Sequence, residues 1–293
     1  MKKTIALILA LVMAAAALAG CASTEKPAEK PAEASAVEEK KYEFTSEELM
    51  LKSGDKNVYG VICKPDTGKE KNPAIIMCHG FNTNADMLEG YAESAAKAGY
   101  VAYRFDFCGG APSSRSDGAT TEMSVLTEAE DLMNVIDQVK ALDYVDENNL
   151  FVLGQSQGGF VAAYTAAKRQ SDVKALILFF PAFVLQENAR NGHENLDSIP
   201  ETETMMGVEV GAIYTRDALS FDIYDVIGDY KGDVLICHGD KDTMVPLSYS
   251  EKALEKYDHA ELKVIKYAEH GFQGKTAKEA TGYVLDFLAA HVS

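Results

Sequence analysis

The apolar run Leu150-Phe151-Val152-Leu153 is followed at once by Gly154-Gln155-Ser156-Gln157-Gly158, and a helix-like stretch comes next. A G-x-S-x-G pentapeptide between a strand and a helix is typical of a sharp strand-to-helix turn. Such a turn holds a serine in strained backbone geometry, with its Oγ projecting from the edge of a sheet. The flanking glycines are needed because side chains there would meet the neighbouring strand and helix. The pentapeptide also occurs by chance, so its context decides its meaning.

Short apolar runs alternate with longer amphipathic stretches along most of the chain. The strand-like runs are 74–78, 100–105, 150–153, 175–180, 234–237 and 262–267. The helix-like stretches are 85–98, 122–142, 160–168, 248–257 and 275–291. Two more strands, about 42–52 and 57–64, are expected before them, joined by a turn at 53–56. This alternation predicts an α/β fold with a mostly parallel central sheet and helices on both faces.

The first 20 residues have the features of a targeting segment. Lys2 and Lys3 give a positive start, and the apolar run 5–18 is too short to favour a permanent membrane span. The run ends in Leu18-Ala19-Gly20-Cys21, which resembles the lipobox of bacterial lipoproteins. That resemblance implies cleavage before Cys21, acylation of Cys21, and an exported chain anchored durably to a bacterial cell membrane. An ordinary secretory signal with an incidental cysteine is the alternative.

The composition of the remaining chain separates a tether from a domain. Segment 21–41 is rich in Ala, Glu, Lys and Pro, and this composition favours a flexible tether. Residues 42–293 are long enough for one domain with a large core. The formal net charge of −17 argues against nucleic acid as a partner. Besides Cys21, the four cysteines fit no zinc spacing and favour buried free thiols.

Downstream of Ser156 stand the residues that would make its hydroxyl a nucleophile. His270 follows the last strand-like run and is assigned as the base that takes the hydroxyl proton. Asp242 is assigned as the acid that orients the imidazole, and Asp240 remains an alternative. The chain order serine, aspartate, histidine is the one that accompanies a G-x-S-x-G turn. This chemistry needs no metal or organic cofactor.

Two backbone N–H groups, those of Phe81 and Gln157, are expected to form the oxyanion hole, because each follows a strand end next to the nucleophile. Other polar residues at strand ends have simpler roles. His79 and His238 are expected to brace loops, and Asp106 is expected to support the Gly109-Gly110 turn.

Segment 183–225 breaks the alternation, and it is too long for an ordinary connection. We therefore expect it to form a cap inserted over the active edge of the sheet. Nine of its residues are acidic, and its basic residues are Arg190 and Arg216, so neutral or weakly charged substrates are expected there. His193, within this segment, and His259, beyond it, are expected at the surface.

Together, these motifs resemble those of the α/β-hydrolase superfamily, and more closely those of serine esterases of the cinnamoyl/feruloyl esterase group. The shared motifs are His79-Gly80-Phe81, Gly154-Gln155-Ser156-Gln157-Gly158-Gly159, His238-Gly239-Asp240-x-Asp242-x-x-Val245-Pro246 and His270-Gly271-Phe272. The resemblance runs from about residue 42 to the C-terminus. It implies that the amides of Phe81 and Gln157 form the oxyanion hole and that the cap shapes a pocket for aromatic acyl groups. Tyr214 either binds such a group or packs within the cap.

The chain departs from the family pattern at Gly110, which stands where the D-x-x-G-H-G-x-S turn of the family has histidine, and in its lipoprotein leader, which is atypical of the family. The sequence therefore predicts a membrane-tethered serine carboxylesterase acting on small esters, either aromatic or short-chain. Three other functions remain open. They are a serine peptidase of the prolyl-oligopeptidase-like or aminopeptidase kind, an acylglycerol lipase, and a lipoprotein that binds a ligand without turning it over.

Overall fold

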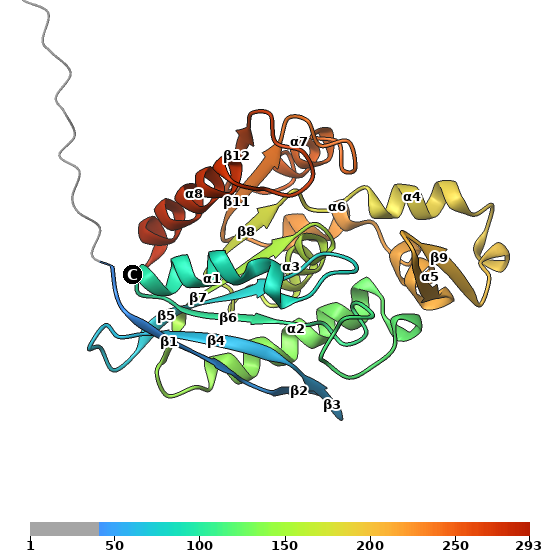
Figure 1. The fold of residues 1–293 in the computed structure, drawn as a ribbon. Helices are drawn as coiled ribbons and strands as arrows, with labels where there is room; N and C mark the ends of the chain where they lie inside the picture. Colours follow the sequence, from blue (N-terminus) through green and yellow to red (C-terminus); the bar gives the residue numbers. More distant parts are fainter. Residues whose placement is uncertain (1–40) are drawn as a thin grey trace, which may run out of the picture. The chain divides into compact units, whose positions relative to one another are not determined.

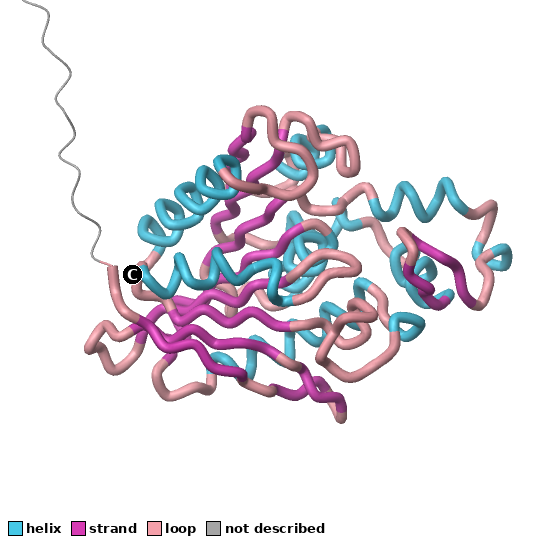
Figure 2. The backbone as a smooth tube through the Cα atoms, in the orientation of Figure 1, coloured by secondary structure: helices cyan, strands magenta, loops and turns pink. Residues whose placement is uncertain are grey.

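A computed structural model describes residues 41–293, and eight of its strands form one continuous sheet (Figure 2). The strand order across this sheet is β1-β4-β6-β5-β7-β8-β11-β12. The pairs β1–β4 and β4–β6 are antiparallel, and the remaining neighbours are parallel. The sheet strands are β1 (Phe44–Glu48), β4 (Gly60–Pro65), β5 (Asn72–Cys78), β6 (Val101–Phe105), β7 (Val145–Gln155), β8 (Ala175–Phe179), β11 (Asp233–Gly239) and β12 (Ala260–Ile265). The prediction of a mostly parallel sheet is confirmed.

Helices cover both faces of this sheet (Figure 1). The helices around it are α1 (Glu89–Lys97), α2 (Val125–Lys140), α3 (Gln157–Lys168), α7 (Ser248–Leu254) and α8 (Lys275–His291). Side chains of α1 and α8 share one buried core, and those of α2 and α3 share the other. Along β7, Leu150 and Val152 face the α2–α3 core, whereas Phe151 and Leu153 face the α1–α8 core. This strand is apolar at successive positions because both of its faces are buried.

The local sequence determines where helix α2 begins and which of its faces is buried. Its N-cap is Ser124, whose Oγ accepts hydrogen bonds of 3.2 Å from the N–H groups of Leu126 and Thr127. Side chains four residues apart, such as Leu132 and Ile136, lie on its buried face. The helix is thus fixed at its start by a cap and along its length by packing.

The two strands predicted before the alternation are each divided in the structure. The first gives β1 and β2 (Leu51–Ser53), and the second gives β3 (Lys56–Val58) and β4. The turn predicted at 53–56 joins β2 to β3, which pair antiparallel apart from the main sheet.

The segment predicted as a cap lies between β8 and β11 and has its own secondary structure. It contains α4 (Leu185–Gly192), the antiparallel pair β9 (Thr202–Met205) and β10 (Val208–Gly211), α5 (Ala212–Leu219) and α6 (Ile223–Val226). Figure 1 shows α4, β9 and α5 together at the right of the view. We call residues 183–225 the inserted segment. Its position after β8 leaves the parallel order of the sheet intact.

The predicted signal segment, Cys21 and all but the last residue of the predicted tether lie outside the described residues. Lipidation and membrane anchoring therefore stay predictions. Within residues 41–293, no helix is both long enough and apolar enough to cross a bilayer.

Candidate active site

Three side chains meet where β7, β11 and β12 end. Ser156 directly follows β7, Asp242 lies in the loop after β11, and His270 lies between β12 and α8. Ser156 Oγ is 3.0 Å from His270 Nε2, and His270 Nδ1 is 2.7 Å from Asp242 Oδ2. A carboxylate can only accept, so Nδ1 carries the ring hydrogen and Nε2 of the neutral imidazole accepts the serine proton. The structure thus brings together the three residues that the sequence assigned to one site.

Ser156 has the strained backbone that the pentapeptide predicts. Its φ of 53° and ψ of −120° fall outside the regions that residues with a side chain ordinarily adopt. A Cβ on Gly154 would lie 2.2 Å from the carbonyl oxygen of Gly158, and one on Gly158 would lie 2.3 Å from that of His79. Both glycines are therefore required, since β7, α3 and the end of β5 approach too closely for side chains.

Asp242 is buried, and both of its carboxylate oxygens are hydrogen-bonded. Oδ1 accepts from the N–H groups of Met244 at 2.9 Å and Val245 at 2.8 Å. Oδ2 accepts from His270, and His238 Nε2 approaches it at 3.3 Å. Burial acts to raise the pKa of Asp242, but hydrogen bonds from His238, His270 and the Val245 amide outweigh it and hold the pKa well below its usual range. The carboxylate is therefore charged at neutral pH and suited to stabilise an imidazolium.

Other polar residues at the strand ends brace loops, as predicted. Asp240, the alternative acid, accepts a hydrogen bond of 2.6 Å from the N–H of Tyr267 and has no contact with the imidazole of the site. His79 Nε2 accepts from the N–H of Phe107 at 3.0 Å, so its Nδ1 carries the hydrogen and donates to the Gly80 carbonyl at 2.7 Å. Burial lowers the pKa of His79, which keeps this ring neutral in its bracing role.

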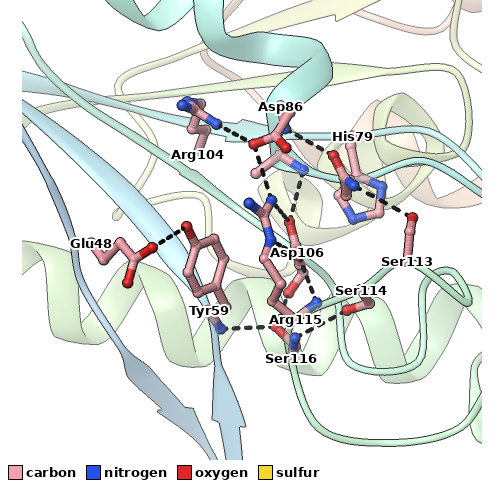
Figure 3. Close-up of polar contacts among 12 residues, drawn as sticks. Glu48, Tyr59, His79, Asp86, Arg104, Asp106, Ser113, Ser114, Arg115 and Ser116 are labelled. Carbon is pink, nitrogen blue, oxygen red and sulfur yellow. Dashed lines mark hydrogen bonds and ion pairs between the residues drawn. The ribbon is translucent and has the colours of Figure 1, made fainter.

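The role expected for Asp106 was wrong. Its carboxylate accepts from the N–H of Ala85 at 2.8 Å and from the N–H and guanidinium of Arg115 at 2.8 to 3.0 Å (Figure 3). Arg115 also reaches Asp86 at 3.1 Å. Asp106 therefore ties the loop that leaves β6, through Arg115, to the segment that follows β5, through Ala85. Its carboxylate binds this guanidinium and these amides rather than the Gly109-Gly110 turn, because a buried carboxylate needs charged or free N–H donors.

The two N–H groups expected to form an oxyanion hole lie beside Ser156. The loop carrying Phe81 passes close to the serine, since a Cβ on Gly80 would be 3.1 Å from Ser156 Cβ. Gln157 is the first residue of α3, where an N–H has no acceptor inside the helix. Among residues 41–293, neither of these two N–H groups finds an acceptor. The position suits both donors, and their role in stabilising an oxyanion stays a prediction.

A buried series of polar groups runs beneath the serine turn, and the sequence analysis missed it. Gln157 Nε2 donates to Glu128 Oε2 at 2.9 Å, and Tyr214 OH donates to Gln157 Oε1 at 2.6 Å. Burial raises the pKa of Glu128 to about 8, so this carboxyl is largely protonated at neutral pH. The signal was present in the sequence. Glu128 falls three residues after Val125 and four before Leu132, on the apolar face of α2, where an acid needs a partner.

Two pockets meet at Ser156. The first, which we call the Gln157 pocket, has a volume of about 170 Å³ and is bounded by Gln157, Tyr214 and residues of the inserted segment. The second, which we call the His270 pocket, has a volume of about 250 Å³ and lies on the imidazole side. Phe81, Ser156, Met206 and Met244 line both pockets. Ser156 therefore stands at the junction of the two pockets.

The surface position expected for His193 was wrong, whereas His259 is exposed as expected. His193 lines the Gln157 pocket, with its Nε2 3.4 Å from Glu203 Oε2. Thr215 Oγ1 donates to the other oxygen of Glu203 at 2.6 Å. The inserted segment folds back on itself, and this brings a histidine from the end of α4 against β9. As a result, a carboxylate lies in the wall of the pocket.

The cysteines and acids give no sign of a metal centre in the part of the chain that the structure describes. Its four cysteines are free and buried, which confirms that prediction. Within residues 41–293, no three side chains of histidine, cysteine, aspartate or glutamate are grouped so that they could hold a metal ion.

Sequence comparisons identify partial relatives. A family model described as serine aminopeptidase, S33, matches residues 69–206, which include Ser156 but neither Asp242 nor His270. An uncharacterized 31.7 kDa Escherichia coli protein from the traX-finO intergenic region is 29% identical over 111 residues, 38% of this chain and 37% of that protein. The serine hydrolase BPHL of Mus musculus is 25% identical over 178 residues, 54% of this chain and 60% of that protein. The aligned regions thus span less than two thirds of either relative.

A solved structure covers much more of the chain. Est1E from Butyrivibrio proteoclasticus, determined with bound ferulic acid, matches with a TM-score of 0.76 and 26% sequence identity. The match covers 83% of this chain and 98% of the Est1E chain.

Proposed function

We propose that this chain, which has the fold of the α/β hydrolases and resembles them in sequence, is a serine carboxylesterase acting through an acyl-enzyme on Ser156. One observation carries the proposal: the hydrogen-bonded series from Ser156 Oγ through His270 to the buried Asp242, with distances of 3.0 and 2.7 Å. A serine hydroxyl is a weak nucleophile by itself, and this series is the arrangement that activates it.

The mechanism follows from the contacts. Ser156 Oγ attacks the ester carbonyl carbon while His270 Nε2 takes the hydroxyl proton, and Asp242 stabilises the resulting imidazolium. The negative oxygen of the tetrahedral intermediate accepts hydrogen bonds from the N–H groups of Phe81 and Gln157. The bond to the alcohol oxygen then breaks, and this oxygen takes the proton from Nε2. Water attacks the acyl-enzyme in the same way, with His270 as base, and releases the acid.

Features of the Gln157 pocket support a single-ring or short acyl group. The rings of Phe81 and Tyr214 line it and pack edge to face, with centroids 5.6 Å apart. Because the Tyr214 hydroxyl already donates to Gln157, the ring would contact an acyl group through its apolar face. The volume of about 170 Å³ suits a small acyl group better than the long chains of an acylglycerol. Est1E, whose structure contains bound ferulic acid, adds support for aromatic acids.

A serine aminopeptidase is the second candidate, and one observation favours it. Glu203 places a carboxylate in the wall of the Gln157 pocket, where it could bind the free amino group of a peptide. The description of the matching family model points to the same activity. Turnover of aminoacyl anilides without turnover of simple esters would select this candidate.

The test compares Ser156→Ala with Ser171→Ala in the full-length chain, using p-nitrophenyl acetate. Ser171 is exposed on the surface and serves as the control. Loss of the Ser156 hydroxyl should lower kcat by at least about 10³-fold, because no acyl-enzyme can form and only the slower direct attack by water remains. A fluorophosphonate probe should label Ser156 in the unmodified chain. Undiminished turnover in the Ser156 variant contradicts the proposal, and failure of the probe to react favours a ligand-binding protein without catalysis.

A further inference from the structure

The His270 pocket has no function assigned so far, and the reaction geometry identifies its occupant. The imidazolium formed during attack must pass its proton to the departing alcohol oxygen, so this oxygen lies within hydrogen-bond reach of His270 Nε2. The substituent on that oxygen therefore extends into the pocket that His270 lines. Gln157, whose N–H faces the oxyanion in the proposed mechanism, lines the other pocket. The acyl part thus belongs in the Gln157 pocket and the alcohol part in the His270 pocket.

The walls of the His270 pocket are mainly apolar. Its large apolar lining residues are Phe81, Met87, Tyr91, Phe180, Met206, Met244 and Phe272. Among residues 41–293, no aspartate, glutamate, lysine or arginine lines it. The polar side chains that line it are Thr83, Gln155, Ser156, His270 and Gln273. The Thr83 hydroxyl already donates to the Gly80 carbonyl at 2.8 Å, and Ser156 and His270 are bonded to each other. A leaving group with many hydroxyls would lose its water there without finding enough partners.

Two aromatic rings form the wall next to the imidazole. The Phe180 ring packs edge to face against His270 at 4.7 Å and against Phe272 at 4.9 Å. Phe180 has a φ of 36°, which is unfavourable for a bulky side chain. A hydrogen bond of 2.8 Å from its N–H to the Cys237 carbonyl holds this conformation. The fold thus keeps a strained residue whose ring faces the position of the leaving group.

The mouth of the pocket is formed by exposed methionines from three separate segments. Met87, Met206 and Met244 are 58%, 62% and 50% exposed. They come from the loop after β5, the turn between β9 and β10, and the loop after β11. Large apolar side chains gathered at one opening indicate a binding surface, and methionine adapts to ligands of different shape.

We infer that the His270 pocket binds the alcohol part of the substrate and that this alcohol is an apolar alkyl or aryl alcohol rather than a sugar or polyol. This inference rests on the proposed esterase function. The His270 pocket then selects the alcohol part of the ester, just as the Gln157 pocket selects the acyl part. Each methylene of the alcohol that enters the pocket loses contact with water and stabilises the transition state for acylation.

The test uses acetate esters, in which the acyl part is constant and the alcohol varies. Ethyl, butyl and hexyl acetate release alcohols of similar acidity, and the monoacetate of diethylene glycol matches the hexyl ester in length but is polar. The full-length chain is assayed by proton release, and kcat/KM is compared because it reports the acylation step. We expect the kcat/KM of hexyl acetate to exceed that of ethyl acetate about 16-fold, because each of four added methylenes gains roughly twofold, half the gain of complete burial. The polar glycol ester should have a kcat/KM about tenfold or more below that of hexyl acetate.

Two methionine variants connect this preference to the pocket. Met87→Ser removes apolar surface from the mouth and should lower the ratio of hexyl to ethyl turnover about threefold. Met50→Ser, at a position 50% exposed and outside both pockets, should leave the ratio and the basal activity unchanged. Equal kcat/KM along the series, or preference for the glycol ester, overturns the inference while the esterase proposal stands. No turnover of any acetate, together with no fluorophosphonate labelling of Ser156, overturns both.

Discussion

The strand-end rim of the sheet, which carries Ser156, Asp242 and His270, and the inserted segment both border the pockets at Ser156, but they hold their side chains in different ways. In the rim, Ser156, His270 and Asp242 are joined by hydrogen bonds of fixed direction, and the acid is buried. In the inserted segment, pocket residues such as Met205 and Met206 contribute mainly apolar surface, and Met206 is largely exposed. In the proposed function, the hydrogen bonds of the rim activate Ser156, whereas the apolar side chains of the inserted segment decide which acyl groups the pocket accepts. Changes in the rim should therefore affect every substrate, and changes in the inserted segment should alter the ranking of substrates.

A hydrogen bond at Tyr214 joins the two regions. Tyr214 of α5 donates to Gln157, whose side chain also donates to Glu128 of α2. Through this buried series, the inserted segment is tied to the residue whose N–H stands beside the nucleophile. A change at Gln157 should therefore affect both the rate for every substrate and the ranking of substrates.

The largest effect is expected from Asp242→Asn, which should lower kcat about 10⁴-fold for all esters tested. The N–H groups of Met244 and Val245 require an oxygen at the position of Oδ1, so the new amide nitrogen must face His270. That nitrogen donates to Nδ1 and shifts the ring hydrogen to Nε2, which then cannot accept the serine proton.

Asp240→Asn is the matched control for this change, because Asp240 contacts the Tyr267 N–H instead of the imidazole. It should alter kcat on p-nitrophenyl esters by less than about threefold. If Asp240→Asn were the more damaging of the two, the acid would have been assigned wrongly and the rim would need a different account.

The second effect concerns stability and its dependence on pH. The pKa of Glu128 is raised by burial from 4.5 to about 8. Between pH 4.5 and about pH 8, Glu128 therefore holds a proton in the folded chain but has released it in the unfolded chain. The contribution of Glu128 to the free energy of unfolding therefore falls as pH rises, by up to about 1.4 kcal/mol per pH unit. Glu128→Gln keeps an acceptor for Gln157 and removes this titration.

Urea unfolding at pH 6 and at pH 8 measures the difference. As the pH rises from 6 to 8, the free energy of unfolding of the Glu128 variant should increase by about 2 to 3 kcal/mol relative to that of the unmodified chain. Glu130→Gln, on the exposed side of the same helix, should follow the unmodified chain. Parallel pH curves for the Glu128 variant and the unmodified chain would mean that Glu128 does not hold a proton in the folded state.

The smallest effect is expected in the inserted segment. Glu203 places a negative charge in the Gln157 pocket, so it should disfavour acyl groups that carry a carboxylate. Glu203→Gln should raise kcat/KM for mono-p-nitrophenyl succinate about threefold relative to p-nitrophenyl butyrate, a modest change because the site is partly hydrated.

Glu209→Gln is the control for Glu203, because Glu209 also belongs to the inserted segment but is exposed and lies outside the pocket. It should leave the ratio of the two esters unchanged. If both variants changed the ratio equally, the selectivity would come from the overall negative charge of the segment and not from its pocket wall.

The sequence allowed much of the rim to be predicted, because its signals are local. The strand before Ser156, the glycines around it and the helix after it lie within a few residues of one another. Asp242 and His270 could be assigned because each follows a strand-like run, and parallel strands bring such positions to one edge. Asp240 stayed an alternative, since two carboxylates in one loop differ only in the direction that the folded loop gives them.

Side chains that depend on distant partners were assigned less well. His193 was expected at the surface, but Glu203 and the pocket enclose it. Asp106 was linked to the nearest glycines, although its main partner, Arg115, is nine residues away. Contacts of this kind arise from loop paths, and no periodicity in the sequence records them.

The amino-acid sequence by itself determined the alternation of strands and helices, the strained serine turn and the chain order of the three reacting residues. These features follow from backbone sterics and from the burial of apolar runs, which act over short distances along the chain. The tertiary structure alone decided which carboxylate meets His270, where Glu128 finds its partner, and how two pockets divide the space around Ser156. These depend on the relative positions of segments that lie from about thirty to more than a hundred residues apart in the chain, which only the packed core fixes.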